Sequence, residues 1–152
     1  MDATGSAAGL LESVPAHATL GLRVTRAVGG IGEVAMPARP ELGNVIGALH
    51  SAGLVGLVDA ACRAAIISAA AHPAQLDGVL PLGASARLEF RAPARGLLLG
   101  RCELATGELD NLCRFYAAAA TRIRLATMAD VLDPAGVAVC RGGFEWSITR
   151  QP

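Results

Sequence analysis

Residues Asn44–Ala71 decide the fold of this chain; their sequence is N-V-I-G-A-L-H-S-A-G-L-V-G-L-V-D-A-A-C-R-A-A-I-I-S-A-A-A. It contains no proline, and its alanines and leucines are strong helix formers, so it predicts one long central helix at 48–71. From Leu49 to Ala61 apolar residues occur on every face, which is typical of a helix buried all round. Such a helix needs other elements wrapped around it.

The segments on either side of this helix supply strands. The clearest runs over 84–91, where alanine, leucine and phenylalanine alternate with serine, arginine and glutamate, as in a strand with one buried face. The same patterns and turn signals predict further strands at 20–28, 31–38, 97–104, 121–132 and 137–148, and helices at 4–14 and 107–119. Pro15 and Gly21 predict a turn before the first strand. This order predicts an α+β fold in which an antiparallel sheet curls around one helix.

Length and charge narrow the class of protein. The 152 residues predict a single domain over 1–152, with 1–16 as an N-terminal helical segment. Thirteen acidic and thirteen basic residues cancel, and there is no basic cluster, so no nucleic-acid partner is expected. Asp59 and Arg63 interrupt the most apolar stretch, so no membrane span is expected, and residues 1–11 lack the pattern of a signal peptide. The expected location is the cytoplasm.

The basic residues and cysteines exclude further chemistry. All thirteen basic residues are arginines, so a lysine Schiff base is impossible. The four cysteines form no C-x-x-C pair and have no histidine clustered beside them, so they are expected to be reduced core residues rather than a metal site or disulfides. Neither a metal nor a resident cofactor is expected. These cysteines are Cys62, Cys102, Cys113 and Cys140.

Two polar residues of the central stretch do not suit an apolar core. A buried, unpaired Asp59 anion would cost several kcal/mol, so this residue is either bonded to backbone amides or an arginine, or is reactive. His50 is either a packing residue or part of a site. The two are nine positions apart, roughly 13 Å along a helix and about half a revolution around it, so they share a site only if a second copy supplies one of them. A two-fold homodimer would form two such sites.

The spacing of Asn44, Gly47, His50 and Asp59 resembles that of the hotdog-fold acyl-CoA thioesterases, in particular the phenylacetate-pathway (PaaI-like) group. Residues 88–96 (L-E-F-R-A-P-A-R-G) look like that family's third strand and its exit, and 133–148 look like its last hairpin. The helix at 107–119 is more like an uncharacterised hotdog branch. The resemblance covers roughly residues 15–150 and implies a hotdog fold and a homodimer or homotetramer.

The resemblance also implies a reaction and its residues. The chain would hydrolyse an acyl-CoA thioester, with coenzyme A as part of the substrate. Asp59 would be the general base or the nucleophile, and a backbone N–H near Ser51, at the open start of the helix, would polarise the carbonyl. Asn44, otherwise a cap or loop brace, would hold the water or the carbonyl, and His50 would orient the helix start. The expected substrate-binding residues are Gly47, Ala52, Gly53, Arg63 and Arg91.

One departure from the family leaves alternatives open. The family's His-Gly-Gly is His50-Ser51-Ala52 here, and the added Cβ atoms narrow the approach of a thioester. A non-catalytic acyl-CoA-binding or sensor protein is therefore the alternative. A hotdog hydratase is a third reading, but its Asp–His loop motif is missing, and neither His17 nor His72 is expected at a site.

Two electrostatic expectations follow. Burial among apolar residues should raise the pKa of Asp59 towards neutrality, as a general base requires. Arg87, Arg91 and Arg95 either contact coenzyme A phosphates or belong to a solvated strand face.

Overall fold

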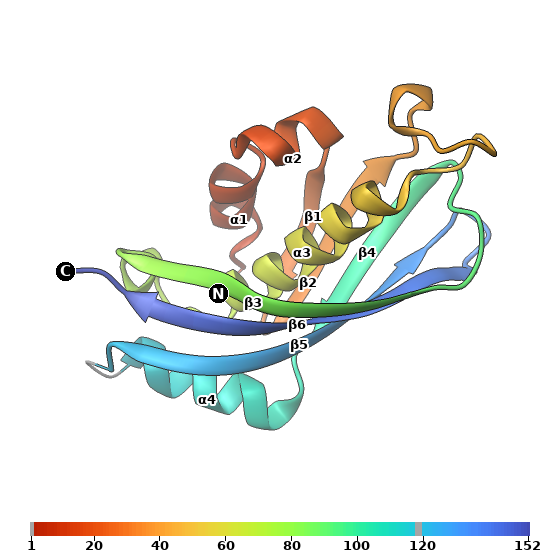
Figure 1. Cartoon of the computed structure of the whole chain (residues 1–152). Helices are drawn as coiled ribbons and strands as arrows, with labels where there is room; N and C mark the ends of the chain where they lie inside the picture. Colours follow the sequence, from red (N-terminus) through yellow and green to blue (C-terminus); the bar gives the residue numbers. More distant parts are fainter. Residues whose placement is uncertain (1, 118–119) are drawn as a thin grey trace.

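The computed structural model describes residues 2–117 and 120–152. One antiparallel sheet, in the strand order β1-β2-β4-β5-β6-β3, curves around a long helix, α3 (Figure 1). This is the hotdog architecture expected from the sequence. The strands are β1 (Arg23–Val28), β2 (Ile31–Pro37), β3 (Val79–Phe90), β4 (Leu97–Glu103), β5 (Arg122–Leu132) and β6 (Ala138–Arg150).

Helix α3 spans Ser51–Ser68, so the predicted range of 48–71 was too long at both ends. The helix begins later than predicted because Leu49 is extended and its N–H donates to the carbonyl of Ala94, 2.8 Å away. His50 then caps the helix, because its Nδ1 accepts a hydrogen bond from the amide of Ala52 at 3.0 Å.

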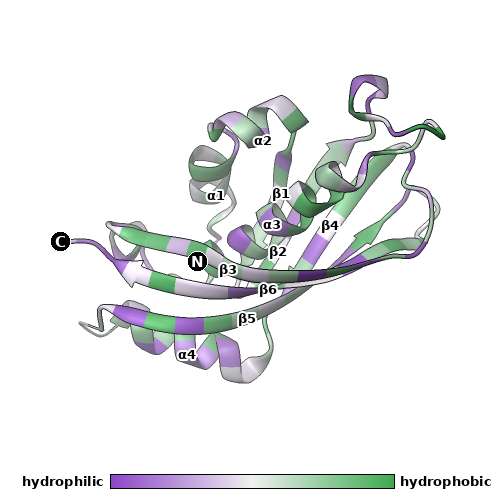
Figure 2. Ribbon diagram, viewed as in Figure 1, coloured by the Kyte–Doolittle hydropathy of each residue, from purple (hydrophilic) through white to green (hydrophobic). Residues whose placement is uncertain are grey.

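The expectation that α3 is buried all round holds only for its later turns. Ser51, Ala52 and Val55 are exposed, whereas most residues from Leu57 onwards are buried. The buried part lies very close to the sheet: a Cβ at Gly32 of β2 would be 2.4 Å from the carbonyl oxygen of Ala61. The helix is long and apolar enough to cross a bilayer (Figure 2), but two thirds of it is buried inside the protein, as expected of a core helix.

Two N-terminal helices, α1 (Thr4–Leu11) and α2 (Pro15–Leu20), cover the side of α3 that the sheet leaves open (Figure 1). The sequence predicted a single helix at 4–14 ending in a turn at Pro15. Instead Pro15 is the first residue of α2, where the missing N–H costs nothing. Gly21, with a φ of 72°, ends α2 in the left-handed conformation.

Helix α4 (Thr106–Ala117) fills a gap between two strands that separate. β4 pairs with β5 only between 99–102 and 129–132, which leaves the first half of β5 without a strand on that side. α4 lies there, and the Tyr116 hydroxyl donates to the carbonyl of Ile66 at 2.9 Å. The predicted helix at 107–119 extends into residues 118–119, which lie outside the described residues.

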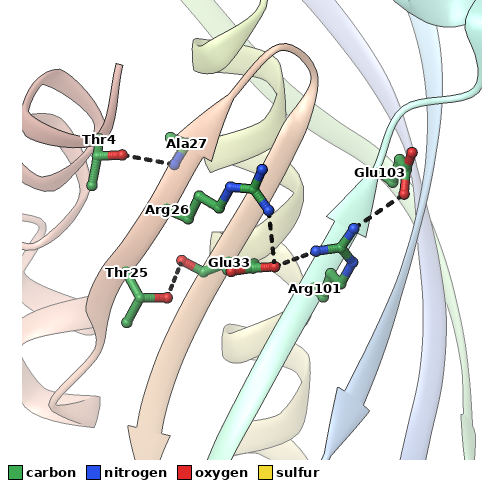
Figure 3. Close-up of polar contacts among 7 residues, drawn as sticks. All are labelled: Thr4, Thr25, Arg26, Ala27, Glu33, Arg101 and Glu103. Atoms are coloured by element: carbon green, nitrogen blue, oxygen red, sulfur yellow. Dashed lines mark hydrogen bonds and ion pairs between the residues drawn. The ribbon is translucent and has the colours of Figure 1, made fainter. Parts of the chain in front are cut away.

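The face of the sheet that points away from α3 carries a network of ion pairs (Figure 3). Glu33 of β2 lies between Arg26 of β1, at 3.8 Å, and Arg101 of β4. Arg101 also contacts Glu103, at 3.3 Å. This half of the outer face is therefore solvated, and the apolar residues of the same strands face α3.

Candidate active site

Asp59 lies in the third turn of α3 with one carboxylate oxygen held and the other open. Oδ2 accepts a hydrogen bond from Arg63 Nε at 2.8 Å, one helical turn later, and lies 3.4 Å from His17 Nε2. Oδ1 has no hydrogen-bond partner within 2–117 and 120–152. The side chain of Asp59 is 19% exposed. The carboxylate is thus anchored through one oxygen and accessible through the other.

Arg63 is itself fixed in place. Its NH1 donates to the carbonyl of Pro81 on β3 at 2.8 Å, and its guanidinium lies over the Trp146 ring, 4.8 Å from the centroid. Two of its N–H donors therefore serve to hold Asp59 and to anchor the side chain to β3, and the predicted substrate-binding role of Arg63 stays a prediction.

His17 is the residue that sequence reasoning missed. It is 6% exposed, its Nδ1 is 2.9 Å from the carbonyl oxygen of Leu11, and its Nε2 faces Asp59. Both ring nitrogens face oxygen atoms, the Leu11 carbonyl on one side and the Asp59 carboxylate on the other. The sequence did not lead us to expect His17 at a site, but α2 carries it onto α3, where it lies 3.4 Å from Asp59.

The pKa of Asp59 is lowered, contrary to the expectation from burial. Desolvation raises it, but the hydrogen bonds from His17 and Arg63, together with their charges, outweigh the burial. The carboxylate is therefore an anion at neutral pH. Arg63 at the i+4 position was the signal in the sequence that could have predicted this.

An apolar pocket of about 440 Å³ opens beside this carboxylate. Its polar side chains, His17, Asp59 and Arg63, lie on α2 and α3. The Tyr116 hydroxyl bonds to the backbone and burial raises its pKa, so it acts as a structural group rather than as an acid. The pocket is lined by Leu10, Leu11, Val14, His17, Asp59, Arg63, Ile67, Leu76, Val79, Pro81 and Tyr116.

A second hollow, of about 320 Å³, lies at the start of α3. It brings together three residues predicted for the site: Asn44, Ser51 and Arg91. Arg91 also forms an exposed ion pair with Glu89 at 3.1 Å. The structure therefore divides the predicted site into a helix-start group and an Asp59 group.

The loop before α3 is braced by its own polar residues. Asn44 Oδ1 accepts from the amides of Ile46, at 3.1 Å, and Ala48, at 3.0 Å. Gly47 has a φ of 74°, and its carbonyl accepts from Arg95 at 2.9 Å. Arg95 is therefore a loop brace and not a free phosphate ligand, while Nδ2 of Asn44 has no acceptor in the described part of the chain.

The amides at the start of α3 differ in availability. Ala52 N–H donates to His50 Nδ1, and Gly53 N–H donates to the carbonyl of His50 at 2.9 Å. The Ser51 amide has no acceptor among the described residues, so it is the donor that a ligand can use. Gly53 is buried, and a Cβ there would be 2.8 Å from Leu49, so its predicted substrate contact is replaced by packing.

No protein-family model matches this chain, and no curated protein matches it either. Several solved structures do match this chain. A protein of unknown function and probable thioesterase from Pseudomonas aeruginosa aligns with a TM-score of 0.78 at 20% identity, covering 97% of this chain and 96% of that one. A thioesterase family protein from Silicibacter pomeroyi aligns with a TM-score of 0.74 at 19% identity, over 95% and 96% of the two chains.

The Escherichia coli PaaI protein, from the phenylacetic acid degradation operon, is more distant. It aligns with a TM-score of 0.68 at 13% identity, over 95% of this chain and 89% of that one. The fold is that of the hotdog thioesterases. At these identities the likeness extends to the fold alone.

In this hotdog chain the two groups of site residues are too far apart to act on one carbonyl. Eight positions separate Ser51 from Asp59, about 12 Å along the helix axis. A single chain therefore offers a carboxylate at one place and a free amide at another.

The described residues include no cluster of metal ligands, and three of the four cysteines are buried. Within 2–117 and 120–152, no group of three or more His, Cys, Asp or Glu side chains is arranged to hold a metal ion. All four cysteines are free; Cys113 is exposed rather than in the core, and the others are buried. A hydrogen bond to Cys102 and burial raise the pKa of Cys62, and burial raises that of Cys140, so these thiols are poor nucleophiles.

Proposed function

We propose that this protein is an acyl-thioester hydrolase that acts as a homodimer. The observation that carries the proposal is the state of Asp59: an ionised carboxylate, held through Oδ2 by Arg63 with His17 beside it, and open at Oδ1, in the wall of an apolar pocket. A carboxylate of this kind can attack a thioester carbonyl or activate a water molecule.

The edge of the sheet supports the homodimer. β3 is twelve residues long and is exposed along most of its length, and among the described residues it pairs with β6 alone. Leu80, Leu82 and Phe90 are 43%, 56% and 54% exposed, and Figure 2 shows hydrophobic colouring at the start of this strand. A long apolar edge is a ready template for pairing with another strand. Pairing of β3 with the β3 of a second copy would join two sheets about a two-fold axis.

In the proposed dimer, the Ser51 amide of one subunit and Asp59 of the other act on the same thioester. In the proposed site, the Ser51 amide of one subunit donates to the thioester carbonyl oxygen while Asp59 of the other attacks the carbonyl carbon. The carbon–sulfur bond breaks, the thiolate of coenzyme A leaves, and a mixed anhydride forms on Asp59. Water then hydrolyses the anhydride, which releases the acid and restores the carboxylate. The free Nδ2 donor of Asn44 is placed to hold the carbonyl or the water.

The lowered pKa of Asp59 favours the nucleophilic route over general-base catalysis. A weakly basic carboxylate is a poor acceptor for a proton from water at neutral pH, but nucleophilic attack needs no proton transfer. A single turnover in ¹⁸O-labelled water separates the two routes when water attacks the Asp59 carboxyl carbon of the anhydride. The nucleophilic route then places the label in Asp59 and leaves the released acid unlabelled, whereas the general-base route labels the acid and leaves Asp59 unlabelled.

Hydrolysis of a panel of acyl-CoA thioesters by wild type and by Asp59→Ala tests the function itself. We expect the variant to lose two or more orders of magnitude in rate, as for other groups that act in the transition state. Asp130→Ala, which removes an exposed aspartate of the outer face, is the matched control and should leave the rate unchanged. Equal rates for wild type and Asp59→Ala on every thioester would contradict the proposal.

The alternative is a non-catalytic acyl-CoA-binding or sensor protein. Two observations favour it: the Ala52 amide is already used by His50, and the family's two glycines are Ser51 and Ala52 here. Ser51 and Ala52 are exposed in the single chain, so their Cβ atoms crowd nothing within it. Acyl-CoA binding without hydrolysis in the panel would establish this alternative.

A further inference from the structure

We propose that the pocket between the N-terminal helices and α3 receives the acyl chain of the substrate, and that it selects an aliphatic chain of roughly six to ten carbons. Leu10 of α1 and Val14, just before α2, are the residues that set this length. The inference rests on the proposed thioester substrate, since it places the reacting carbonyl at Asp59.

The distribution of polarity in the pocket supports an aliphatic ligand. Its charged side chains stand together on α2 and α3, and its remaining walls are apolar. The Tyr116 hydroxyl bonds to the Ile66 carbonyl, so that polar atom is already satisfied. A ligand with a polar head and an apolar tail fits this arrangement, with its carbonyl at Asp59 and its tail along the apolar walls.

The volume of the pocket sets the length. At roughly 30 Å³ for each non-hydrogen atom, taken from the volume of a water molecule, 440 Å³ holds at most about fifteen atoms. Leu10 and Val14 are 52% and 37% exposed, so they mark the mouth, where a ligand is only partly enclosed. The carbonyl end also occupies part of the space. The enclosed part therefore suits about six to ten carbons.

The wall formed by α1 and α2 is anchored rather than loose. Glu12, between the two helices, accepts from the backbone amide of Val24 at 3.0 Å and pairs with Arg23 at 2.8 Å, both on β1. His17 links the carbonyl of Leu11 to Asp59. A substitution at the mouth should therefore change the shape of the pocket and not the position of the helices.

Calorimetric binding of acyl-CoA thioethers, which cannot be hydrolysed, to the full chain tests the inference. Each buried methylene should tighten binding by about fourfold until the chain fills the pocket, near eight carbons, after which affinity should level off. Val14→Phe should shift this plateau to shorter chains. The matched control is Val137→Phe, the same change at a valine that is 50% exposed and outside the pocket, and it should leave the plateau in place.

Enlarging the mouth gives the opposite test. Leu10→Ala should move the plateau to longer chains, whereas Leu97→Ala, at a leucine 60% exposed elsewhere, should not. An affinity that does not change from acetyl to decanoyl, or equal effects of Val14→Phe and Val137→Phe, would overturn the inference. A plateau that moves as expected in a protein without hydrolysis would support the acyl pocket and reject the proposed enzyme. Hydrolysis with no dependence on chain length would do the reverse.

Discussion

Replacing Arg63 with methionine removes its charged hydrogen bonds to Asp59 and to the Pro81 carbonyl, and keeps an apolar side chain near Trp146. The bond to Asp59, from which the magnitude is taken, is 2.8 Å long, and its two side chains are 27% and 19% exposed. Hydrogen bonds to charged groups contribute about 1.5–3 kcal/mol, and the partial exposure favours the lower part of that range. We expect the free energy of unfolding to fall by about 1.5–2 kcal/mol and the melting temperature by roughly 3–8 °C.

The pH dependence separates the ionic contribution of Arg63 from its packing. The folded-state pKa of Asp59 is lowered, so its charge contributes stability that is present above the unfolded pKa, about 3.9, and is lost as the pH falls through the folded pKa. In the variant, burial is no longer offset by Arg63. Urea unfolding should therefore show the largest gap between wild type and variant near neutral pH, and a gap that narrows towards about pH 4 and below.

Arg141→Met is the matched control for this prediction. It also breaks an arginine–aspartate pair, but Arg141 and Asp130 are 44% and 40% exposed. An exposed pair contributes at most about 1 kcal/mol, so the loss should be small at every pH. The reasoning fails if Arg141→Met costs as much as Arg63→Met, or if the Arg63→Met gap is the same in acid as at neutral pH.

Three further changes test the fold and its edge. Gly32→Val places a Cβ about 2.4 Å from the Ala61 carbonyl oxygen, so it should cost about 3 kcal/mol or more and reduce the soluble yield. Trp146→Phe removes the 2.8 Å bond from Nε1 to Thr127 and should cost about 1–3 kcal/mol in urea unfolding. Leu82→Lys charges the free edge of β3, and sedimentation should show it as a monomer that keeps its fold; an unchanged dimer would contradict pairing through β3.

The layout of the chain was predictable because most elements carry local signals. The apolar run of α3 and the alternation along β3 both depend on residues close together in sequence, and both appear within a few residues of their predicted places. The predictions were wrong at the ends of the helices. Pro15 was interpreted as a turn although it also suits the first position of a helix, and Leu49 pairs with a residue far along the chain, which no local pattern reports.

The site was predictable in its residues but not in its arrangement. Asp59 stood out as a carboxylate in an apolar helix, and Arg63 one turn later was the local clue to its partner. The contact with His17 depends on α2 folding back over α3 across 42 positions of sequence, so no spacing rule predicts it. The sign of the Asp59 pKa shift depends on that same contact, which is why burial alone predicted the wrong direction.

Mixing two inactive variants tests most directly whether one site is built from two chains. Asp59→Ala removes the carboxylate. Asn44→Asp keeps an oxygen for the loop amides and removes the free Nδ2 donor. In a heterodimer of the two, one site regains both an intact Asp59 and an intact Asn44, so an equal mixture should recover about a quarter of wild-type hydrolysis. A mixture as inactive as its components, or wild-type activity in a monomer, would contradict the shared site.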